Sequence, residues 1–370
     1  MPSRTQHSPA AGANAGTDAT GHALAAAEQP SSEERAAMRR AIELARRGLG
    51  RTSPNPVVGC AVLDAAGAMV GQGWHARAGG PHAEVVALAD AGAGARGGTA
   101  VVTLEPCAHS GRTGPCTEAL LAAGIARVVV ALPDPTETAG GGADVLRAAG
   151  VQVVSGVLAD EAAAANIAWL TSVRLSRPYV TWKYAATLDG RTAAADGTSR
   201  WITGPAARAD VHRLRDEVDA VLVGTGTALA DDPTLTVRDL PDHDGRQPLR
   251  VVLGERPLPA GSRLLDGAGE TLQLRQRDPH AALATLHERG VRHVLVEGGA
   301  TVAGAFVAAG LIDQVIGYHA PALLGAGSPL LAGAGIGTIA EALRLEVTDV
   351  RRVGSDVRVT ARPVTSERED

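Results

Sequence analysis

The sequence predicts an α/β protein with two successive domains, each made of a sheet covered by helices. Three observations support this prediction. A chain of 370 residues is long enough to bury two separate cores. Short apolar runs of strand length alternate with segments of helical periodicity along most of the chain. An Ala-rich helical segment over residues 158–176 ends at Arg177-Pro178, where we place the domain boundary.

The composition narrows the class of protein. Only 2 % of the residues are aromatic while 45 % are apolar, so Val, Leu, Ile and Ala must fill the cores. The net charge of −5 argues against general binding to nucleic acid or acidic membranes. Three cysteines without regular spacing suit a reducing compartment. There is no membrane-length apolar run and no secretory signal, so we expect a cytoplasmic protein. The oligomeric state stays open, a homo-oligomer included.

The first domain is expected over residues 32–176, after a disordered tail over residues 1–31 that has no hydrophobic period. A helix starts at Ser32 and continues with amphipathic spacing to about Gly48. Two later helices begin at candidate metal ligands, where the positive end of the helix dipole lowers thiol pKa values. We expect strands over 57–63, 69–74, 99–104, 127–132 and 151–154, and helices over 83–91, 117–123, 143–149 and 161–169.

The second domain is expected over residues 177–370 and repeats the α/β alternation without internal sequence similarity to the first. Two glycine loops follow strands in this half, at 223–227 and at 296–301. Backbone N–H groups of the second loop could hold a phosphate, although glycines also simply end strands. We expect strands over 179–185, 220–223, 250–253, 293–296, 314–319, 344–350 and 356–361, and helices over 205–217, 281–289 and 301–309.

The strongest chemical signal is a set of one imidazole and two thiols. His82, Cys107 and Cys116 offer the nitrogen and sulfur ligands that Zn²⁺ prefers, and three protein ligands leave a fourth position open for water. Glu84 lies two residues after His82 and is interpreted as a catalytic proton carrier. The pattern is typical of zinc-dependent deaminases, except that eight residues separate the cysteines where two are usual. The alternatives are a closed structural zinc site or three unrelated core residues.

Other residues carry weaker signals. Asn55 in a Pro-Asn-Pro turn could hydrogen-bond a heterocycle or serve the turn alone. His75 and His109 flank the metal segments, where ordinary loop roles stay open. Arg112 could clamp a phosphate or be solvated. Cys60, inside an apolar strand, is interpreted as a core residue.

Together these motifs resemble the bifunctional riboflavin-biosynthesis deaminase/reductase family, from about residue 33 to the C-terminus. The deaminase half is matched by His82-Ala83-Glu84, Thr103-Leu104-Glu105-Pro106-Cys107 and Pro115-Cys116-Thr117. The reductase half is matched in the family's order by Thr187-Leu188-Asp189-Gly190-Arg191, Ser199-Arg200-Trp201-Ile202-Thr203, Leu229-Ala230-Asp231-Asp232-Pro233 and Val296-Glu297-Gly298-Gly299.

The resemblance implies two successive reactions. A cytidine-deaminase-like α/β/α sandwich with one Zn²⁺ would deaminate a diamino-phosphoribosylaminopyrimidine. A domain similar in fold to dihydrofolate reductase would then use NADPH to reduce the ribosyl group to ribityl. Contacts to the first substrate are implied for Asn55, His75, His109 and Arg112. Contacts to the second are implied for Lys183, Ser199, Arg215, Leu235, Arg238 and Glu297, with phosphate expected at Arg215 and Arg238. The NADPH groove is implied for Ala185, Trp201, Thr227, Asp231, Gly299, Ala300, Thr301, Val302, Ala303, Gly304 and Ala305.

Three positions depart from the family's usual pattern. Thr136 follows Asp134-Pro135 where an Asn is common, and would weaken first-site binding if that Asn contacts substrate. Gly114 replaces a Pro between the cysteines and should only loosen the loop. Gly254-Glu255 replaces Asp-Ser at an edge of the cofactor site.

Two competing functions follow from the same residues. One is a nucleic-acid-editing zinc deaminase with a C-terminal binding module, which the acidic net charge and the scarcity of stacking aromatics disfavour. The other is a non-catalytic scaffold stabilised by zinc. The proton donor of the reductase stays open, with Lys183 and Asp231 as candidates, as does direct transfer of product between the sites.

Overall fold

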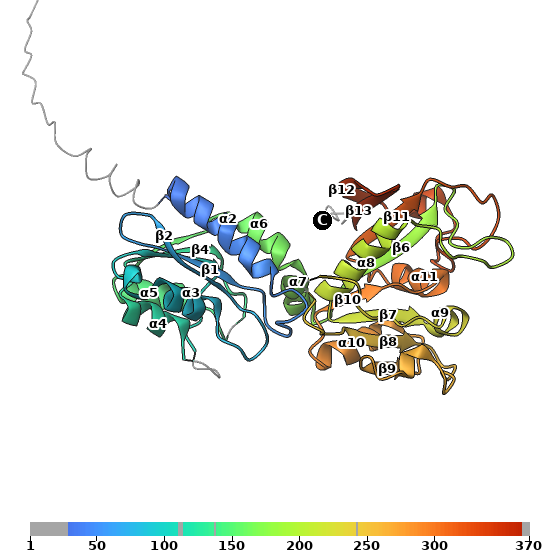
Figure 1. Cartoon of the computed structure of the whole chain (residues 1–370), viewed down its shortest axis with the longest axis horizontal. Helices are drawn as coiled ribbons and strands as arrows, with labels where there is room; N and C mark the ends of the chain where they lie inside the picture. The colour runs from blue at the N-terminus through green and yellow to red at the C-terminus, as the bar shows by residue number, and fades with distance from the viewer. Residues whose placement is uncertain (1–28, 110–113, 137, 242, 365–370) are drawn as a thin grey trace, which may run out of the picture.

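The computed structural model describes residues 29–109, 114–136, 138–241 and 243–364. These residues form two α/β units that lie side by side, each with its own sheet (Figure 1). The first sheet has five strands and the second has eight. The predicted α/β class is therefore confirmed in both halves. Among the described residues, no helix combines the length and apolar character needed to cross a bilayer.

The first unit opens with α2 (Ser32–Arg46). The Ser31 hydroxyl accepts a hydrogen bond from the backbone N–H of Glu34, and the Glu34 carboxylate accepts one from the backbone N–H of Ser31. This reciprocal cap satisfies two otherwise unpaired donors and sets the start of the helix. The sheet order is β2-β1-β3-β4-β5, with β1 antiparallel to both neighbours and the last three strands parallel. Its strands are β1 (Gly59–Leu63), β2 (Met69–Trp74), β3 (Thr99–Leu104), β4 (Arg127–Leu132) and β5 (Gln152–Ser155).

Helices cover both faces of this sheet. The helices α2 and α6 (Ala159–Ala165) lie on one face, where Val101 and Val129 are buried. The helices α3 (Ala83–Ala91), α4 (Cys116–Ala123) and α5 (Gly142–Ala148) lie on the other, above Val102 and Val130. Alternate residues of β3 and β4 thus serve opposite cores, as a strand period of two requires. The segments that follow β3 and β4 are joined by the Glu105 carboxylate, which accepts hydrogen bonds from the backbone N–H groups of Asp134 and Ala143.

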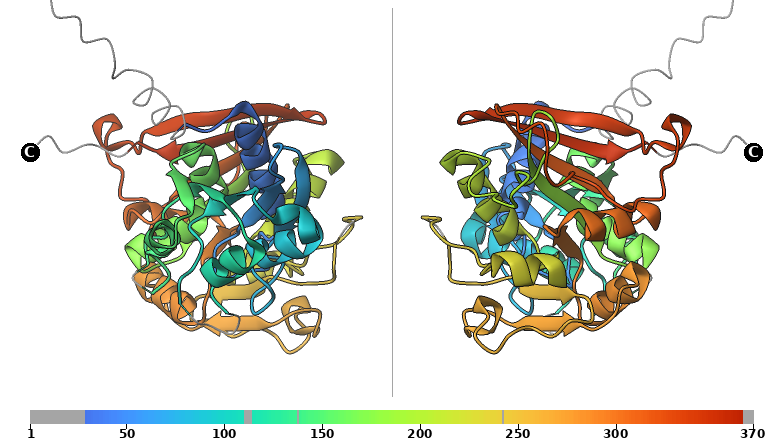
Figure 2. Two further views of the ribbon diagram at one scale, coloured as in Figure 1. Left: turned by 90° about the vertical axis from the view of Figure 1, so that its left-hand side faces the viewer. Right: turned by 90° about the vertical axis from the view of Figure 1, so that its right-hand side faces the viewer.

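The second unit has the strand order β12-β13-β11-β6-β10-β7-β8-β9. Six neighbouring strands, from β11 to β9, are parallel, and β13 and β12 add an antiparallel pair at one edge (Figure 2). The strands are β6 (Tyr179–Thr187), β7 (Ala220–Gly224), β8 (Leu249–Leu253), β9 (Thr271–Leu274), β10 (His293–Val296), β11 (Gln314–Ala320), β12 (Leu345–Val353) and β13 (Asp356–Pro363). The helices are α8 (Pro205–Glu217), α9 (Thr225–Asp231), α10 (Pro279–Glu288) and α11 (Ala300–Ala308).

Most elements match the expected ranges, and three differ. The helix expected over 161–169 is two helices, α6 and α7 (Ile167–Leu175), which meet at Asn166. There the Asn166 side chain accepts a hydrogen bond from the backbone N–H of Val57 and donates one to the Val57 carbonyl. The short elements α9 and β9 were not expected at all.

Ionic contacts join the two units. The turn before β1 carries Arg51, whose guanidinium lies 3.2 Å from an Asp216 oxygen and 2.8 Å from an Asp244 oxygen. Two residues later, the Ser53 hydroxyl donates to Asp219 across 2.8 Å. Asp216 lies in the last turn of α8 and Asp219 just after it, so the first unit contacts the C-terminal end of this helix of the second unit.

Two candidate active sites

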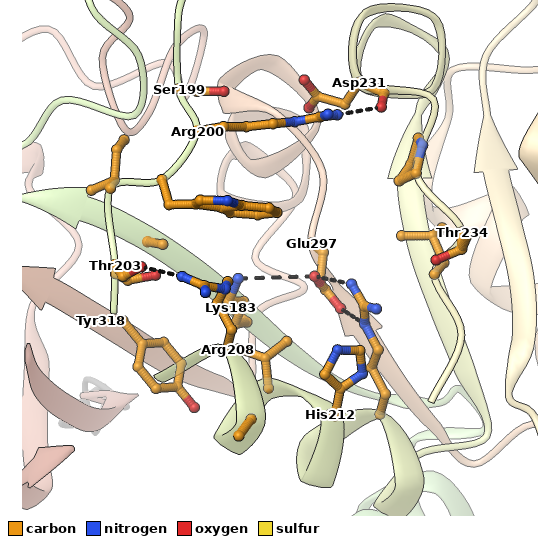
Figure 3. Close-up of a pocket in the computed structure, with 18 of the residues that line it drawn as sticks. Lys183, Ser199, Arg200, Thr203, Arg208, His212, Asp231, Thr234, Glu297 and Tyr318 are labelled. Carbon is orange, nitrogen blue, oxygen red and sulfur yellow. Dashed lines mark hydrogen bonds and ion pairs between the residues drawn. The ribbon is translucent and has the colours of Figure 1, made fainter. Parts of the chain in front are cut away.

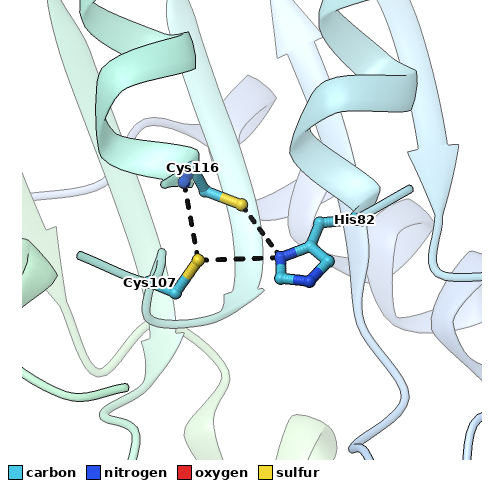
Figure 4. A group of neighbouring side chains, drawn as sticks. All are labelled: His82, Cys107 and Cys116. Atoms are coloured by element: carbon cyan, nitrogen blue, oxygen red, sulfur yellow. Dashed lines mark hydrogen bonds between the residues drawn. The ribbon is translucent and has the colours of Figure 1, made fainter. Parts of the chain in front are cut away.

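The three predicted metal ligands converge on one point (Figure 4). His82 is the residue before α3, Cys107 lies in the loop after β3, and Cys116 is the first residue of α4. The His82 Nδ1 atom lies 3.1 Å from the Cys116 Sγ atom and 3.6 Å from the Cys107 Sγ atom. A tetrahedral zinc with bonds of about 2.0 Å to nitrogen and 2.3 Å to sulfur separates such ligands by about 3.5 Å. The donor set and its spacing therefore fit zinc.

The fold supports thiolate character at Cys107, whereas the hydrogen bond with Cys107 and burial raise the pKa of the Cys116 thiol. The backbone N–H of Cys116, at the N-terminus of α4, points at the Cys107 sulfur across 3.5 Å. A hydrogen bond from the Cys116 side chain is the largest influence that lowers the pKa of Cys107, to about 4, and burial opposes it. Thiolates are the form that binds zinc, so the local electrostatics favour metal binding.

Glu84 lies beside the ligand cluster and outside it. Among the described His, Cys, Asp and Glu residues, the group at this site whose ligand atoms are close enough to bind one metal ion contains His82, Cys107 and Cys116. Glu84 is not part of that group. Its carboxyl on the first turn of α3 is 3 % exposed, and burial raises its pKa. It contacts Cys116 through a side-chain hydrogen bond. A buried carboxyl with a raised pKa, close to the predicted metal ligands, suits proton transfer.

The other residues expected at the first site are spread out. His75 is buried, its ring lies 5.6 Å from the His82 ring, and its Nδ1 donates to the Pro81 carbonyl across 2.9 Å. It therefore packs directly against the metal segment. His109 is exposed two residues after Cys107, and Asn55 is exposed in the turn near the second unit. Arg112 lies outside the described residues.

The departures from the family pattern have local roles. The Thr136 hydroxyl donates to the Asp134 carboxylate across 2.6 Å, which stabilises this loop. Gly114 is exposed with open space around it. A Cβ atom at Gly254 would lie 2.6 Å from the Thr225 hydroxyl, and its φ of 135° also favours glycine. The Gly254 backbone therefore packs against α9, which carries residues expected at the cofactor groove.

Metal removal gives a direct test of this site. Cys107→Ser should lower the zinc content from about one ion per chain to near zero, because hard serine oxygen is a poor zinc ligand. Ammonia release should be lost with the metal, while the second unit stays folded and active. Zinc is measured by elemental analysis. Cys60→Ala is the matched control, since Cys60 is buried in the β1 core and should leave zinc bound. Full zinc content in Cys107→Ser would contradict the assignment.

The second site is a cavity of about 710 Å³ over the carboxyl ends of the parallel strands of the larger sheet (Figure 3). All six residues expected to meet the second substrate line it: Lys183, Ser199, Arg215, Leu235, Arg238 and Glu297. Four residues expected at the cofactor do so as well: Ala185, Trp201, Thr227 and Asp231. The structure thus brings together residues from positions 183 to 297 of the chain.

The segment 299–305 lies next to this cavity and does not line it. The backbone N–H of Gly299, the residue before α11, donates to the Thr227 hydroxyl across 3.0 Å and so joins the two glycine loops. Further along, Ala303 and Gly304 are buried, and a Cβ at position 304 would clash with the Ala332 carbonyl. Only the start of α11 is therefore accessible to a phosphate.

A buried charge network forms the floor of the cavity. Glu297, directly after β10, accepts hydrogen bonds from Arg215 at 2.6 and 3.0 Å, and the Lys183 ammonium lies 3.9 Å away. Burial, the largest influence, opposes ionisation, yet Arg215 and Lys183 lower the pKa of Glu297 to about 2. Burial also lowers the pKa of Lys183. The charged Glu297 therefore orients two cations at the bottom of the site.

The same network includes Arg215, one of the two arginines expected at a phosphate. Arg215 also donates to the Thr236 carbonyl at 3.0 Å, so its guanidinium is held by protein acceptors on two sides. Arg238 has a side chain that is 51 % exposed and faces the same cavity. Of the two arginines expected at a phosphate, Arg238 is the more exposed. Leu235 lines the cavity but is 2 % exposed and packs in the core.

Several lining residues were not expected. Arg208 and His212 share one face of α8 with Arg215, at spacings of four and three residues, and Tyr318 faces the cavity from β11. The helical spacing was a usable signal, because the helix itself was expected over the same range. Arg263, which lies in a short turn before β9, had no such signal.

Comparisons with known proteins agree with both sites. Residues 31–132 match the family model described as the cytidine and deoxycytidylate deaminase zinc-binding region, and residues 178–359 match the RibD C-terminal domain. The riboflavin biosynthesis protein RibD of Mycobacterium tuberculosis is 49 % identical over 324 residues, covering 87 % of this chain and 95 % of the relative. RibD of Escherichia coli K12 is 42 % identical over 355 residues, covering 86 % and 96 %.

Two solved structures are similar to this chain over both of its units. Acinetobacter baumannii RibD superposes with a TM-score of 0.84 at 42 % identity, covering 90 % of this chain and 99 % of that one. A diaminohydroxyphosphoribosylaminopyrimidine deaminase/5-amino-6-(5-phosphoribosylamino)uracil reductase from Thermotoga maritima superposes with a TM-score of 0.83 at 35 % identity, with coverage of 90 % and 99 %. The zinc-binding unit followed by the reductase unit, the match over both halves and the shared fold agree, and the chain belongs to the RibD family of riboflavin biosynthesis proteins.

Proposed function

We propose that this chain catalyses two consecutive steps of riboflavin biosynthesis. The first is hydrolytic deamination of a diaminohydroxyphosphoribosylaminopyrimidine, and the second is NADPH-dependent reduction of the ribosyl group of 5-amino-6-(5-phosphoribosylamino)uracil. The observation that carries the proposal is the His82, Cys107 and Cys116 cluster with the buried Glu84 beside it, in one chain with the larger cavity. We assign deamination to residues 32–176 and reduction to residues 177–370.

At the first site, Glu84 moves the proton. His82, Cys107 and Cys116 would hold a zinc ion, which when bound would make water a better nucleophile at neutral pH. Glu84 takes a proton from the attacking water and returns it to the leaving nitrogen, so that a C–O bond replaces a C–N bond and ammonia departs. His75 supports this site, because its hydrogen bond to the Pro81 carbonyl fixes the segment that carries His82. Asn55, His75, His109 and Arg112 are proposed to contact the substrate.

At the second site, the chain positions substrate and cofactor. NADPH supplies the hydride. Glu297 holds Lys183 and Arg215 at the cavity floor, and Arg238 receives the substrate phosphate. Trp201, Thr227 and the Gly299–Ala300 helix start are proposed to contact NADPH, since a helix N-terminus stabilises phosphate. Ser199 and Asp231 complete the cavity wall.

The remaining assignments follow from charge and cysteine chemistry. We propose that nucleic acid is not a partner, because the net charge is −5 and the larger cavity suits a small molecule. We propose a cytoplasmic location, because Cys60, Cys107 and Cys116 are all free thiols and two of them serve a metal site.

One experiment tests the proposed function. The purified protein is incubated with the diaminopyrimidine ribotide, with and without NADPH, and ammonia and product mass are followed. We expect ammonia in both reactions, the deaminated ribosyl product without NADPH, and a ribityl product two mass units heavier with NADPH. Absence of ammonia would refute the deaminase assignment, and absence of the mass shift would refute the reductase assignment. Salt-dependent RNA or DNA binding at micromolar protein would favour an editing enzyme instead.

A further inference from the structure

The wall of the larger cavity carries an arginine that has no role in the proposed mechanism. Arg263 begins the short 3₁₀ helix Arg263–Leu265 between β8 and β9, and it lines the cavity together with Thr234 and Arg238. Its side chain is exposed, and its guanidinium makes no hydrogen bond and no ion pair with any residue that the structure describes. A guanidinium in the wall of a binding cavity, without a protein acceptor, is available to an anionic ligand.

The backbone of Arg263 is held in place although its guanidinium is not. The Arg250 side chain is 1 % exposed, and its Nη1 atom donates to the carbonyls of Thr234 and Arg263, each across 3.3 Å. The Asp232 carboxylate accepts a hydrogen bond from the backbone N–H of Arg263 across 2.8 Å. These contacts join the turn that carries Arg263 to the segment that carries Arg238. The two arginines therefore reach the cavity from backbone that one buried side chain fixes.

The charges of Arg238 and Arg263 are close enough to affect each other. Burial is the largest influence that lowers the pKa of Arg238, and the guanidinium groups of Arg215 and Arg263 add to it. Among the described residues, Arg238 has one ion-pair partner, the exposed Asp239 carboxylate at 3.7 Å, and Arg263 has none. Two like charges held near each other repel, and a bound anion turns this repulsion into attraction. The arrangement suits a doubly charged group such as a phosphate monoester.

Two phosphate sources could meet this pair, the ribotide and the cofactor. The Arg238 Nη1 atom donates to the Thr234 hydroxyl across 3.1 Å, and Figure 3 shows Thr234 on the far side of Glu297 from Tyr318. Arg238 is the residue proposed to meet the substrate phosphate. The helix start proposed to meet cofactor phosphate, at 299–300, does not line the cavity. The position beside Arg238 therefore favours the phosphate of the ribotide.

We propose that Arg263 is a substrate-binding residue of the reductase site, and that its guanidinium forms, together with that of Arg238, the binding site for the phosphate of the ribotide. Each guanidinium offers a planar set of N–H donors that matches phosphate oxygens. Arg250 is the positioning residue for this pair. The inference rests on the proposed function, because it takes the reductase substrate to be the ligand of the cavity.

The test measures the contribution of the phosphate itself. The KM for the deaminated ribotide is compared with the inhibition constant of the corresponding riboside, which lacks the phosphate. We expect Arg263→Gln to raise the KM for the ribotide about tenfold, the equivalent of about 1.4 kcal/mol from a lost charge-assisted contact. The inhibition constant of the riboside and the KM for NADPH should each change less than twofold. Arg263→Lys should recover part of the loss, since lysine keeps the charge without the planar donors.

Three results would overturn the proposal. An equal loss of affinity for ribotide and riboside would show a general disturbance of the cavity instead of a lost phosphate contact. An increase in the KM for NADPH alone would place Arg263 at the cofactor. An unchanged KM for the ribotide would remove Arg263 from the site.

A control variant and thermal unfolding separate binding from structure. Arg289 pairs with Glu270 on the surface and does not line the cavity, so Arg289→Gln should leave all three constants within twofold of the wild type. Because the Arg263 guanidinium has no partner among the described residues, Arg263→Gln should leave the melting temperature of the ligand-free protein unchanged. A lower melting temperature with an unchanged KM for the ribotide would show a structural role and contradict the proposal.

The wild-type reaction keeps this result separate from the proposed function. If wild-type protein oxidises NADPH with the ribotide and Arg263→Gln has the same constants, only the assignment of Arg263 fails. If wild-type protein itself shows no ribotide-dependent oxidation, the reductase assignment fails, and the assignment of Arg263 fails with it.

Discussion

Glu84→Gln should reduce ammonia release about a thousandfold and leave zinc bound. The amide keeps the size of the buried side chain but cannot carry a proton between water and the leaving nitrogen, a task that typically contributes about 10²–10⁴ in rate. The ligands His82, Cys107 and Cys116 are unchanged, so zinc content should stay near that of the wild type. Ammonia release and elemental analysis measure the two effects on the same sample.

Glu84→Gln has two controls, a second Glu→Gln substitution and the reductase activity of the same protein. Glu118 lies exposed on the first turn of α4, and Glu118→Gln should leave ammonia release within twofold of the wild type. NADPH oxidation with previously deaminated substrate should be normal in Glu84→Gln. An active Glu84→Gln enzyme with full zinc would remove Glu84 from the mechanism, and loss of zinc would make it a ligand instead of a proton carrier.

Glu297→Gln should reduce the reductase kcat/KM about a hundredfold and destabilise the second unit. The change removes the only carboxylate that the described structure pairs with both Arg215 and Lys183. Side-chain exposures of 8 to 15 % in this trio mean that two cations would be left in a poorly solvated site. Removing one partner of a buried ion pair costs about 3–5 kcal/mol. NADPH oxidation and denaturant unfolding measure the two losses.

The matched control for Glu297→Gln is an exposed ion pair. Glu255 pairs with Arg277 at 3.0 Å, with side chains 60 % and 81 % exposed. Glu255→Gln should change stability by less than about 1 kcal/mol, because water already solvates both groups. Equal losses in the two variants would show that the buried network has no special role. Ammonia release should be normal in both, since neither residue belongs to the first unit.

Much of the fold could be predicted because strand and helix periods are local. Val101 and Val102 face opposite cores, and such alternation is visible in the sequence alone. The elements that were missed depend on distant contacts or are short. The break at Asn166 arises from hydrogen bonds to Val57, which is 109 residues away in the chain. The helix Thr225–Asp231 has only seven residues and opens with a glycine-rich stretch that reads as a loop.

The zinc site could be predicted for a similar reason. His82, Glu84, Cys107 and Cys116 occur in short motifs whose chemistry is evident from residue type. The charge network of the second site could not be predicted from local motifs. Arg215 and Glu297 are 82 residues apart, and from the sequence either could have been a surface residue. Sequence reasoning grouped them by family resemblance and expected phosphate at Arg215 and Arg238. The structure adds that Arg215 pairs with Glu297, while Arg238 is more exposed and also lines the cavity.

The turn that carries Arg51 has a consequence for dividing the chain. Its guanidinium lies between Asp216 and Asp244, two acidic side chains that both approach His243. A fragment beginning at Arg177 would keep Asp216 and Asp244 but lose the Arg51 guanidinium. The two carboxylates would then repel each other near the C-terminal end of α8. The same helix presents His212 and Arg215 to the larger cavity. In the isolated C-terminal fragment, the helix that lines the active site would therefore lack the Arg51 ion pairs at its C-terminal end.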